Sequence, residues 1–399
     1  MKVGVVGCGI VGPAVALLLT RDGHDVEVFE RSVPARATGA GFLLQRLGQL
    51  VVEELGLGEA LRSQSATVRR VHARARSGRV VLDFGYDDVV PGAAGWGVNR
   101  ETLCRLLVEA LSSADIPLRT EHAVERLSHR AGRWWLDFPD GEAGPFDLVI
   151  GADGARSKVR RQIGAARKDV GYPYGALWSV VPDPEGIAGD VLHQRYADTR
   201  ITLGVLPVGI GEACIYWSVP NRKMGAVLAA GPAAWVAEAR PHAGHLAPLV
   251  DRAANAGLIG ARYRDVFVTS PFIEQDRTGV VLVGDAAHAM SPQLGLGASI
   301  GLADAWTLAA CLRDNPGDLR RALSEYADER RAHVRWYTWC SRLLTPAFQS
   351  DLVPLGWLRD ALLGPIGRVP WVRGQFVTTF MGIRTSPWTY LRDRPADPE

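Results

Sequence analysis

Three glycines near the start of the sequence have the spacing of a phosphate-binding loop. Gly7, Gly9 and Gly12 follow a short apolar run, and an apolar helical pattern begins directly behind them. Glycines at this spacing permit a tight turn, close approach of the backbone to a pyrophosphate, and close packing of a helix on a strand. The N-terminus of the helix adds free N–H groups and a partial positive charge. The pattern therefore predicts a βαβ unit that binds a nucleotide.

An acidic residue stands where such a unit contacts a ribose. Gly23 is expected to end the first helix, Val26 and Val28 lie in the next strand, and Glu30 is at its end. A carboxylate at this place accepts hydrogen bonds from both hydroxyls of an adenosine ribose and disfavours a 2′-phosphate. We therefore expect FAD or NAD, rather than NADP, as the bound nucleotide.

Two later motifs also follow predicted buried strands. Asp153 and Gly154 precede a basic helix start, although such a pair is most often only a turn. Asp285 follows the apolar run 280–283, where its carboxylate could bind a polyol. The glycine-rich segment 294–299 precedes a helix, so its N–H groups could face a flavin carbonyl or a phosphate. The simpler alternative is that this segment is only a helix cap with a turn. The carboxyl ends of parallel strands share one edge, so the three motifs are expected to meet there.

In this order the three motifs resemble those of the group A flavoprotein monooxygenases, the para-hydroxybenzoate hydroxylase family. The likeness extends to about residue 340. In that family the first motif binds the ADP half of FAD, the middle motif contacts FAD and a transient NAD(P)H, and the last contacts the ribityl chain and the isoalloxazine ring. The resemblance implies FAD binding by Gly7, Gly9, Ile10, Val11, Gly12, Glu30, Arg31, Gly41, Arg100, Val124, Asp153, Asp285, Pro292, Gly295, Leu296, Gly297 and Ala298.

The order of predicted strands and helices, together with this resemblance, predicts an α/β fold. We expect a Rossmann-type FAD-binding domain with an inserted antiparallel β-sheet substrate domain and a C-terminal helical tail. The expected division is 1–70, 97–174 and 267–340 for the FAD-binding domain, 71–96 and 175–266 for the β-rich substrate-binding domain, and 341–399 for a helical or irregular tail.

The sequence departs from the family pattern at the last motif. The family usually has Gln and Asn where this chain has Leu296 and Ser299. Because the backbone donors survive these changes, FAD binding is still expected, whereas the polarity of the pocket beside the flavin could differ. Gln45 and Arg46 also occupy a loop where the family more often has small and amide residues, so no substrate contact is inferred there.

The resemblance implies a monooxygenase. NADH or NADPH would reduce FAD, and O2 would then form a C4a-hydroperoxyflavin whose distal oxygen is delivered to an electron-rich carbon. The substrate is expected to be a small or medium-sized organic molecule, aromatic or polyketide-like, with hydroxylation favoured over epoxidation or Baeyer–Villiger insertion. Only one Rossmann unit is recognised in the sequence, which fits a nicotinamide that visits the protein transiently.

The resemblance requires no universal catalytic side chain, and none is assigned. His288 is expected to be a packed or hydrogen-bonded residue. Two alternatives stay open at this point. One is an FAD-dependent oxidase, dehydrogenase or reductase on the same scaffold, and the other is a flavin-binding protein without catalysis.

Aromatic residues of the predicted inserted sheet are candidates for the substrate pocket, although such residues more often belong to a core. The candidates are Trp178, Tyr196, Tyr216 and Trp217. The segment 352–383 mixes Leu, Trp and Arg residues without clear periodicity. Packing on the protein's own body is its expected role, with a cap over the active site, a dimer surface and membrane contact as alternatives.

Composition argues against several kinds of partner. The 399 residues carry a net charge of +2, which offers no broad attraction to nucleic acid. The five cysteines have no spacing typical of a metal site. No apolar stretch is long enough for a membrane span, and the chain enters a core strand directly after Lys2, which leaves no room for a signal peptide. We therefore expect a cytoplasmic monomer or homodimer that acts on a small molecule and O2 and binds no metal.

Overall fold

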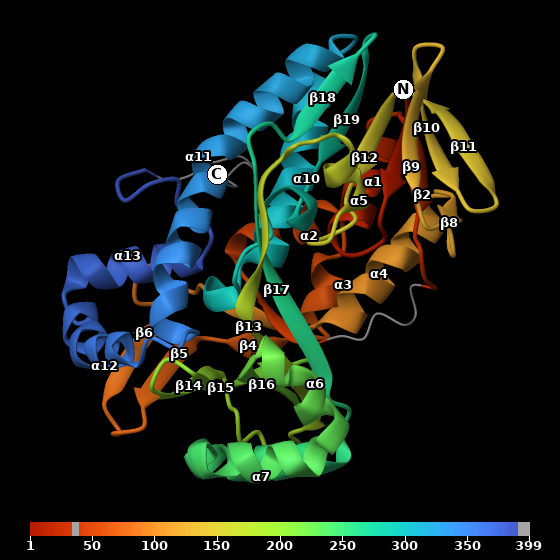
Figure 1. The fold of residues 1–399 in the computed structure, drawn as a ribbon. Helices are drawn as coiled ribbons and strands as arrows, with labels where there is room; N and C mark the ends of the chain where they lie inside the picture. The colour runs from red at the N-terminus through yellow and green to blue at the C-terminus, as the bar shows by residue number, and fades with distance from the viewer. Residues whose placement is uncertain (34–39, 390–399) are drawn as a thin grey trace.

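A six-stranded sheet forms the centre of the first domain in the computed structural model, which describes residues 1–33 and 40–389 (Figure 1). Its order is β18 (Phe272–Gln275), β19 (Thr278–Leu282), β12 (Leu148–Gly151), β1 (Lys2–Val6), β2 (Asp25–Phe29) and β8 (Leu118–Arg119). Neighbouring strands are parallel, except that β18 and β19 are antiparallel. Strands β1, β12 and β19 are apolar and almost wholly buried, as expected for a parallel sheet covered by helices.

Long helices cover this sheet. α1 (Val11–Arg21) packs against α10 (Gly297–Asp314) and α4 (Arg100–Ser113), and α11 (Leu319–Phe348) runs along α10 and past β18 and β19 (Figure 1). α1 ends before Gly23, whose φ of +83° belongs to the left-handed region, as the sequence predicts. The apolar sides of these helices and both faces of β1 supply the main hydrophobic core.

A second sheet of seven strands forms the strand-rich domain. Its order is β17 (Ile259–Val268), β13 (Ala166–Pro182), β16 (Glu212–Pro220), β15 (Ile201–Val208), β14 (Val191–Ala197), β5 (Arg70–Ala75) and β6 (Val80–Gly85). The pairs are antiparallel except β14 with β5, which is parallel. α6 (Asn221–Ala230), α7 (Pro232–Ala243) and α8 (Ala247–Arg252) cover one face of this sheet. Its other face turns toward the first domain and the C-terminal helices.

Smaller elements complete the two domains. One small sheet contains β3 (Gly41–Leu44), β7 (Gly95–Asn99) and β4 (Ala66–Val68), and another contains β9 (Arg126–Arg130), β10 (Arg133–Phe138) and β11 (Gly141–Phe146). The shorter helices are α2 (Arg46–Glu54), α3 (Gly58–Arg62), α5 (Lys158–Gln162), α9 (Asp285–His288), α12 (Val353–Gly367) and α13 (Pro370–Phe380). Short 3-10 turns lie at Gly244–Leu246, Ala253–Asn255 and Pro292–Leu294.

This architecture confirms the predicted fold class, with a Rossmann-type sheet, an inserted strand-rich domain and C-terminal helices. Five elements, β5, β7, β13, β17 and α11, continue through the predicted boundaries at residues 70, 96, 174, 266 and 340, so each is shared between predicted domains. The last part of the predicted tail, 390–399, lies outside the described residues. Within 1–33 and 40–389, no helix combines the length and the apolar character that a membrane crossing requires.

Candidate functional site

The three sequence motifs meet at one edge of the parallel sheet. Val6 is paired with Phe29 on one side and with Gly151 on the other, and Gly151 is paired with Leu282. The carboxyl ends of β2, β1, β12 and β19 are therefore aligned. Each motif begins within a few residues of these ends, so the prediction that they converge is confirmed. Ligands of open α/β sheets bind at this kind of edge.

The glycine loop after β1 has the shape of a phosphate cradle. Gly7 has φ +109°, and a Cβ placed on Gly12 would lie 1.9 Å from the carbonyl oxygen of Gly7. A Cβ placed on Gly9 would meet no atom of the described part of the chain within 4 Å, so these residues leave the space above Gly9 open. Helix α1 has neither a side-chain cap nor an acidic residue in its first turn, so the N–H groups near Ile10 and Val11 are free to bind an anion.

Glu30 is tied to this loop. The backbone N–H of Cys8 donates to Oε2 of Glu30 over 2.8 Å, and the backbone N–H and hydroxyl of Ser32 both donate to Oε1. The Glu30 side chain is partly exposed, and Arg31 beside it is exposed. The carboxylate is therefore held next to the cradle with lone pairs left for the hydroxyls of a ribose.

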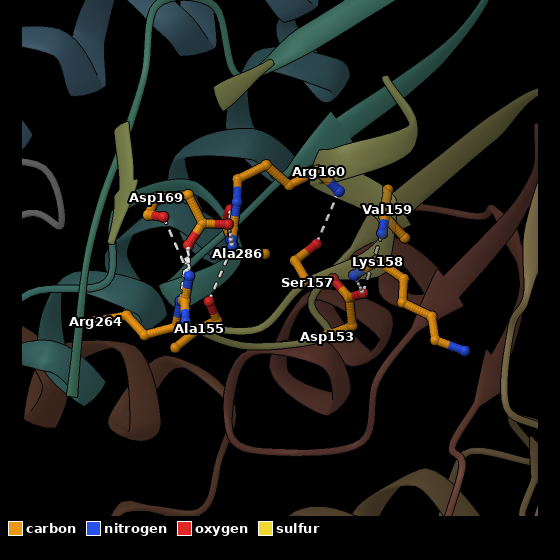
Figure 2. Close-up of polar contacts among 9 residues, drawn as sticks. All are labelled: Asp153, Ala155, Ser157, Lys158, Val159, Arg160, Asp169, Arg264 and Ala286. Carbon is orange, nitrogen blue, oxygen red and sulfur yellow. Dashed lines mark hydrogen bonds and ion pairs between the residues drawn. The ribbon is translucent and has the colours of Figure 1, made fainter. Parts of the chain in front are cut away.

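Asp153 of the middle motif caps a helix. Its Oδ2 accepts hydrogen bonds from the backbone N–H groups of Lys158, at 2.7 Å, and Val159, at 3.2 Å, at the start of α5 (Figure 2). Its Oδ1 is buried and has no hydrogen-bond partner among residues 1–33 and 40–389. A buried carboxylate oxygen without a donor is costly, so Oδ1 is suited to a donor from a bound ligand.

A buried arginine connects the middle motif to the last one. Arg160 donates to the carbonyl oxygen of Ala286 over 2.8 Å and to the carboxylate of Asp169, also over 2.8 Å (Figure 2). Arg264 from β17 donates to the same carboxylate over 2.7 Å. Burial alone would raise the pKa of Asp169, but the hydrogen bonds from the two arginines lower this pKa below its usual value. This ion cluster fixes α9 beside the middle motif.

The last motif has exposed residues at the sheet edge and one buried leucine between two of them. Asp285, Pro292, Gly295 and Gly297 are exposed, whereas Leu296 is buried in an apolar cluster. A Cβ placed on Gly295 would meet no atom within 4 Å, and the atom nearest to a Cβ on Gly297 would be Oδ1 of Asp285, at 3.8 Å. The Asp285 carboxylate therefore lies beside the N-terminus of α10, which has no side-chain cap. A polyol and a carbonyl oxygen would both find partners here.

A buried triad supports this motif from behind. Oδ2 of Asp304 accepts hydrogen bonds from the backbone N–H of Gly284 and from Nε2 of His288, and Oδ1 accepts one from Nε of Arg330 over 2.7 Å. Burial alone would raise the pKa of Asp304, but the charges of His288 and Arg330 lower it well below its usual value. His288 is thus a hydrogen-bonded structural residue, as expected. No sequence signal identified Arg330, because α11 brings it to the site.

The remaining predicted cofactor residues lie around these motifs. The N–H of Gly41 donates to Sγ of Cys214 over 3.1 Å, which joins β3 to the strand-rich domain. Arg100 is exposed at the first residue of α4. Val124 is buried in the cluster behind the ends of β1 and β2. Ala298 is partly buried in the first turn of α10.

The four aromatic candidates for the substrate pocket do not lie together. Trp178 and Tyr216 face the first domain and the C-terminal helices, with ring centroids 5.1 Å apart. Tyr196 is buried on the same face and packs on Phe348 of α11. Trp217 points to the opposite face, where it belongs to the core beneath α7 and α8. Strand alternation separates Tyr216 from Trp217.

Gln45 also lies at the site, where no substrate contact was inferred from the sequence. Its side chain is wholly buried, and its Nε2 donates to the hydroxyl of Tyr86 over 2.8 Å. Its backbone N–H donates to Oγ of Ser299 in the first turn of α10, over 3.2 Å. Ser299 therefore anchors the loop before α2 to the helix end that carries the last motif.

Comparison with known proteins agrees with this geometry. The profile of a protein family described as "FAD binding domain" matches residues 1–223 and 265–338. The chain is 30% identical over 353 residues to 3-amino-4-hydroxybenzoate 2-monooxygenase of Streptomyces cremeus. The aligned region covers 83% of each chain. It is 26% identical to 6-hydroxynicotinate 3-monooxygenase of Pseudomonas fluorescens, over 78% of this chain and 83% of the relative.

A solved structure shows the same fold. The crystal structure of Klebsiella pneumoniae HpxO complexed with FAD and uric acid superposes with a TM-score of 0.81 at 23% identity, and covers 96% of this chain and 97% of the other. At this level of identity the superposition establishes only the fold. The family profile and the relatives compared by sequence establish the class of protein. Neither the oxidase or reductase alternative nor the non-catalytic alternative is supported by these comparisons.

Proposed function

The chain belongs to the FAD-binding-domain family of flavin-dependent monooxygenases, and from this premise we propose that it hydroxylates a small or medium-sized aromatic ring bearing a hydroxyl or amino group. It is an FAD-dependent monooxygenase that uses NADH or NADPH and O2. The relatives' names support the ring class, since they specify an aminohydroxybenzoate and a hydroxynicotinate. Hydroxyl and amino groups donate electrons to a ring, which suits oxygen transfer to carbon.

The residues at the sheet edge fit FAD. The open space over Gly9 and the uncapped start of α1 would take the pyrophosphate, Glu30 the adenosine ribose, and Asp285 the ribityl chain. When bound, FAD supplies the redox chemistry, in which it accepts a hydride from NAD(P)H and activates O2. The free N–H groups at the start of α10 would stabilise negative charge on a neighbouring carbonyl oxygen.

Trp178 and Tyr216 are proposed as the wall that orients the substrate ring. The ring of Tyr216 lies directly over Gly204, because a Cβ on Gly204 would stand 1.8 Å from a ring carbon. Nε2 of Gln194 donates to the hydroxyl of Tyr216, which leaves the phenolic proton available to a substrate oxygen. Burial raises the pKa of Tyr216 far above its usual value, so this proton stays in place at neutral pH.

One observation carries the proposal: the strand-rich domain packs directly against β3 and β7, and Gly41 of β3 is one of the residues expected to bind FAD. A Cβ on Gly97 would lie 1.9 Å from the carbonyl oxygen of Pro207, and one on Gly41 would lie 2.4 Å from Val208. Cys214 contacts Gly41 and shares a face of β16 with Tyr216. The aromatic face of the inserted sheet is therefore held toward the proposed FAD site, and close packing there would exclude water from the reaction.

The substrate class is tested with a panel of compounds. The holoenzyme is supplied with NADH or NADPH in air, and nicotinamide oxidation is measured with aminohydroxybenzoates, hydroxypyridines, their unsubstituted parent rings and aliphatic acids. The proposal predicts stimulation by substituted rings and an increase in KM for Trp178→Ala, with little change for Trp217→Phe on the opposite face. Stimulation by aliphatic compounds alone, or equal effects of the two variants on KM, would contradict it.

We also propose that the chain works in the cytoplasm as a monomer or homodimer, with the domain division given above. The absence of paired cysteine spacing supports a reducing compartment. The position of β3 and β7 between the two large sheets supports a discontinuous FAD-binding domain. Light scattering of the purified protein tests the oligomeric state.

A further inference from the structure

An ordinary surface helix turns its apolar side toward the protein and its charged side toward solvent, and helix α12 does the opposite. Its charged residues, Arg359 and Asp360, lie on the side that packs against the protein, and Arg359 is only 4% exposed. The outward side is apolar. Its large residues are Trp357, Leu358, Leu362 and Ile366, with exposed fractions of 67%, 55%, 45% and 41%.

Specific contacts fix Arg359 on the inner side. Its guanidinium donates to the carbonyl oxygens of Ala347, at 2.8 Å, and Asp198, at 3.1 Å, and pairs with Asp360. The guanidinium carbon also lies 4.4 Å from the ring centroid of Tyr196. The buried charge is therefore compensated by hydrogen bonds, an ion pair and a cation–π contact.

The small residues of α12 prevent the helix from turning its apolar side inward. A Cβ on Gly364 would lie 2.2 Å from the carbonyl oxygen of Val80, and one on Gly356 would lie 3.1 Å from the backbone of Asp198. Only glycine fits these contacts closely, so a rotation that placed Trp357 or Leu358 there would produce clashes. The outward orientation of the large apolar residues is thus built into the packing.

The apolar surface continues beyond the helix. Val369 and Trp371 are exposed by 50% and 57%, and the ring of Trp371 lies 5.8 Å from that of Trp388, which is 75% exposed. In Figure 1, α12 and α13 lie at one side of the molecule, away from β2 and β8 at the far edge of the parallel sheet. We call the set Trp357, Leu358, Leu362, Ile366, Val369 and Trp371 the α12 face. Contiguous exposed apolar residues of this kind mark interaction surfaces.

Arginines border the α12 face. Arg79 is exposed in the turn between β5 and β6, next to the contact of Val80 with α12, and Arg368 is exposed directly after the helix. Across residues 1–33 and 40–389 no acidic side chain forms an ion pair with Arg79 or Arg368. We call these two residues the arginine edge.

We propose that the α12 face docks on the surface of an anionic lipid bilayer, with the arginine edge on the headgroups. A helix of this length spans about 22 Å and would lie in the plane of the interface, where tryptophan and arginine are favoured. Anionic headgroups complement both the apolar face and the charged edge. The proposal does not depend on the oxygenation chemistry.

The test is co-sedimentation of the holoenzyme with vesicles of phosphatidylcholine alone or mixed with phosphatidylglycerol. We expect binding to the anionic vesicles that weakens with salt. Replacing Trp357 and Leu362 together by Ser should weaken binding about tenfold or more, and each of Arg79→Gln and Arg368→Gln about fivefold. Ile210→Ser is the matched control, because Ile210 is 76% exposed on the β15–β16 turn. FAD absorbance and NAD(P)H oxidation confirm that each variant is folded.

Three results would overturn the proposal. The first is no sedimentation of the wild-type holoenzyme with anionic vesicles above that of a non-binding protein. The second is equal binding by the Trp357/Leu362 variant and the Ile210 control. The third is a stable dimer in light scattering without lipid that Trp357→Glu converts to a monomer, because the α12 face would then belong to a second copy of the chain.

Discussion

The backbone N–H of Cys8 donates a hydrogen bond to the carboxylate of Glu30, with 2.8 Å between N and Oε2. This bond joins the glycine loop after β1 to the end of β2. It holds the acidic group on the side of the cradle where the adenosine ribose is proposed to lie. We therefore propose that Glu30 binds the ribose, a role that affinity measurements can separate from the stability of the fold.

Replacing Glu30 by Ala should weaken FAD binding by about tenfold to a hundredfold, because hydrogen bonds to a charged group contribute about 1.5–3 kcal/mol. Titration of the apoprotein with FAD, followed by quenching of flavin fluorescence, measures the change. Glu109→Ala is the control, since Glu109 only forms an exposed pair with Arg105. Equal affinities of the two variants would remove Glu30 from the site.

Gly9 and Gly12 should respond differently to the same substitution. Gly12→Ala places a Cβ 1.9 Å from a backbone oxygen, so it should lower the free energy of unfolding or prevent folding. Gly9→Ala places its Cβ in open space, so it should leave the unfolding transition of the apoprotein unchanged and weaken FAD binding. Urea denaturation and FAD titration separate the two effects. A Gly9→Ala variant with native FAD affinity would show that the pyrophosphate lies elsewhere.

Asp304→Asn should destabilise the protein by about 3–5 kcal/mol, because it leaves Arg330 buried without its ionic partner. The loop that carries Asp285 should also loosen, since Gly284 loses a charged acceptor. Glu325→Gln removes an exposed pair with Arg321 and should destabilise the protein far less, because water and salt screen an exposed ion pair. Chemical denaturation of both variants provides the comparison, and equal losses would contradict a structural role for the triad.

Acid should destabilise the protein through the same triad. The pKa of Asp304 is lower in the folded protein than in the unfolded chain, so its contribution to stability is present above the unfolded pKa, near 4. That contribution is lost as pH falls below this value toward the folded pKa. Asp169 and Asp265 have lowered pKa values and act in the same direction. Urea unfolding at neutral and acidic pH should show a smaller decline for Asp304→Asn than for the wild type, and an equal decline would count against this source of pH dependence.

The local features of the cofactor site could be predicted from the sequence because short segments determine them. The spacing of Gly7, Gly9 and Gly12 dictates a turn between a strand and a helix, and Glu30 follows from the length of the next strand. Arg330 could not be predicted, because it reaches Asp304 only when α11 docks against α10. Its position in a long, charged helix is typical of a solvated face.

The orientation of the aromatic residues proposed to face the substrate could not be predicted from the sequence. Alternation along β16 requires that Tyr216 and Trp217 point to opposite faces, but it does not say which face turns toward the flavin site. Packing of α7 and α8 on Trp217 decides this, and those helices follow the strand in the sequence. In the tail, the apolar spacing of α12 is helical, yet its orientation depends on the contact of Gly364 with Val80, which the sequence does not show.

The measurement that tests the central claim most directly is turnover under isotopically labelled O2. The holoenzyme, NADH or NADPH and a ring compound that stimulates nicotinamide oxidation are incubated under 18O2, and the product is analysed by mass spectrometry. The account predicts one labelled oxygen atom in each hydroxylated product and no product without O2. Product that contains oxygen only from water, or that forms equally well without O2, would contradict the assignment as a monooxygenase.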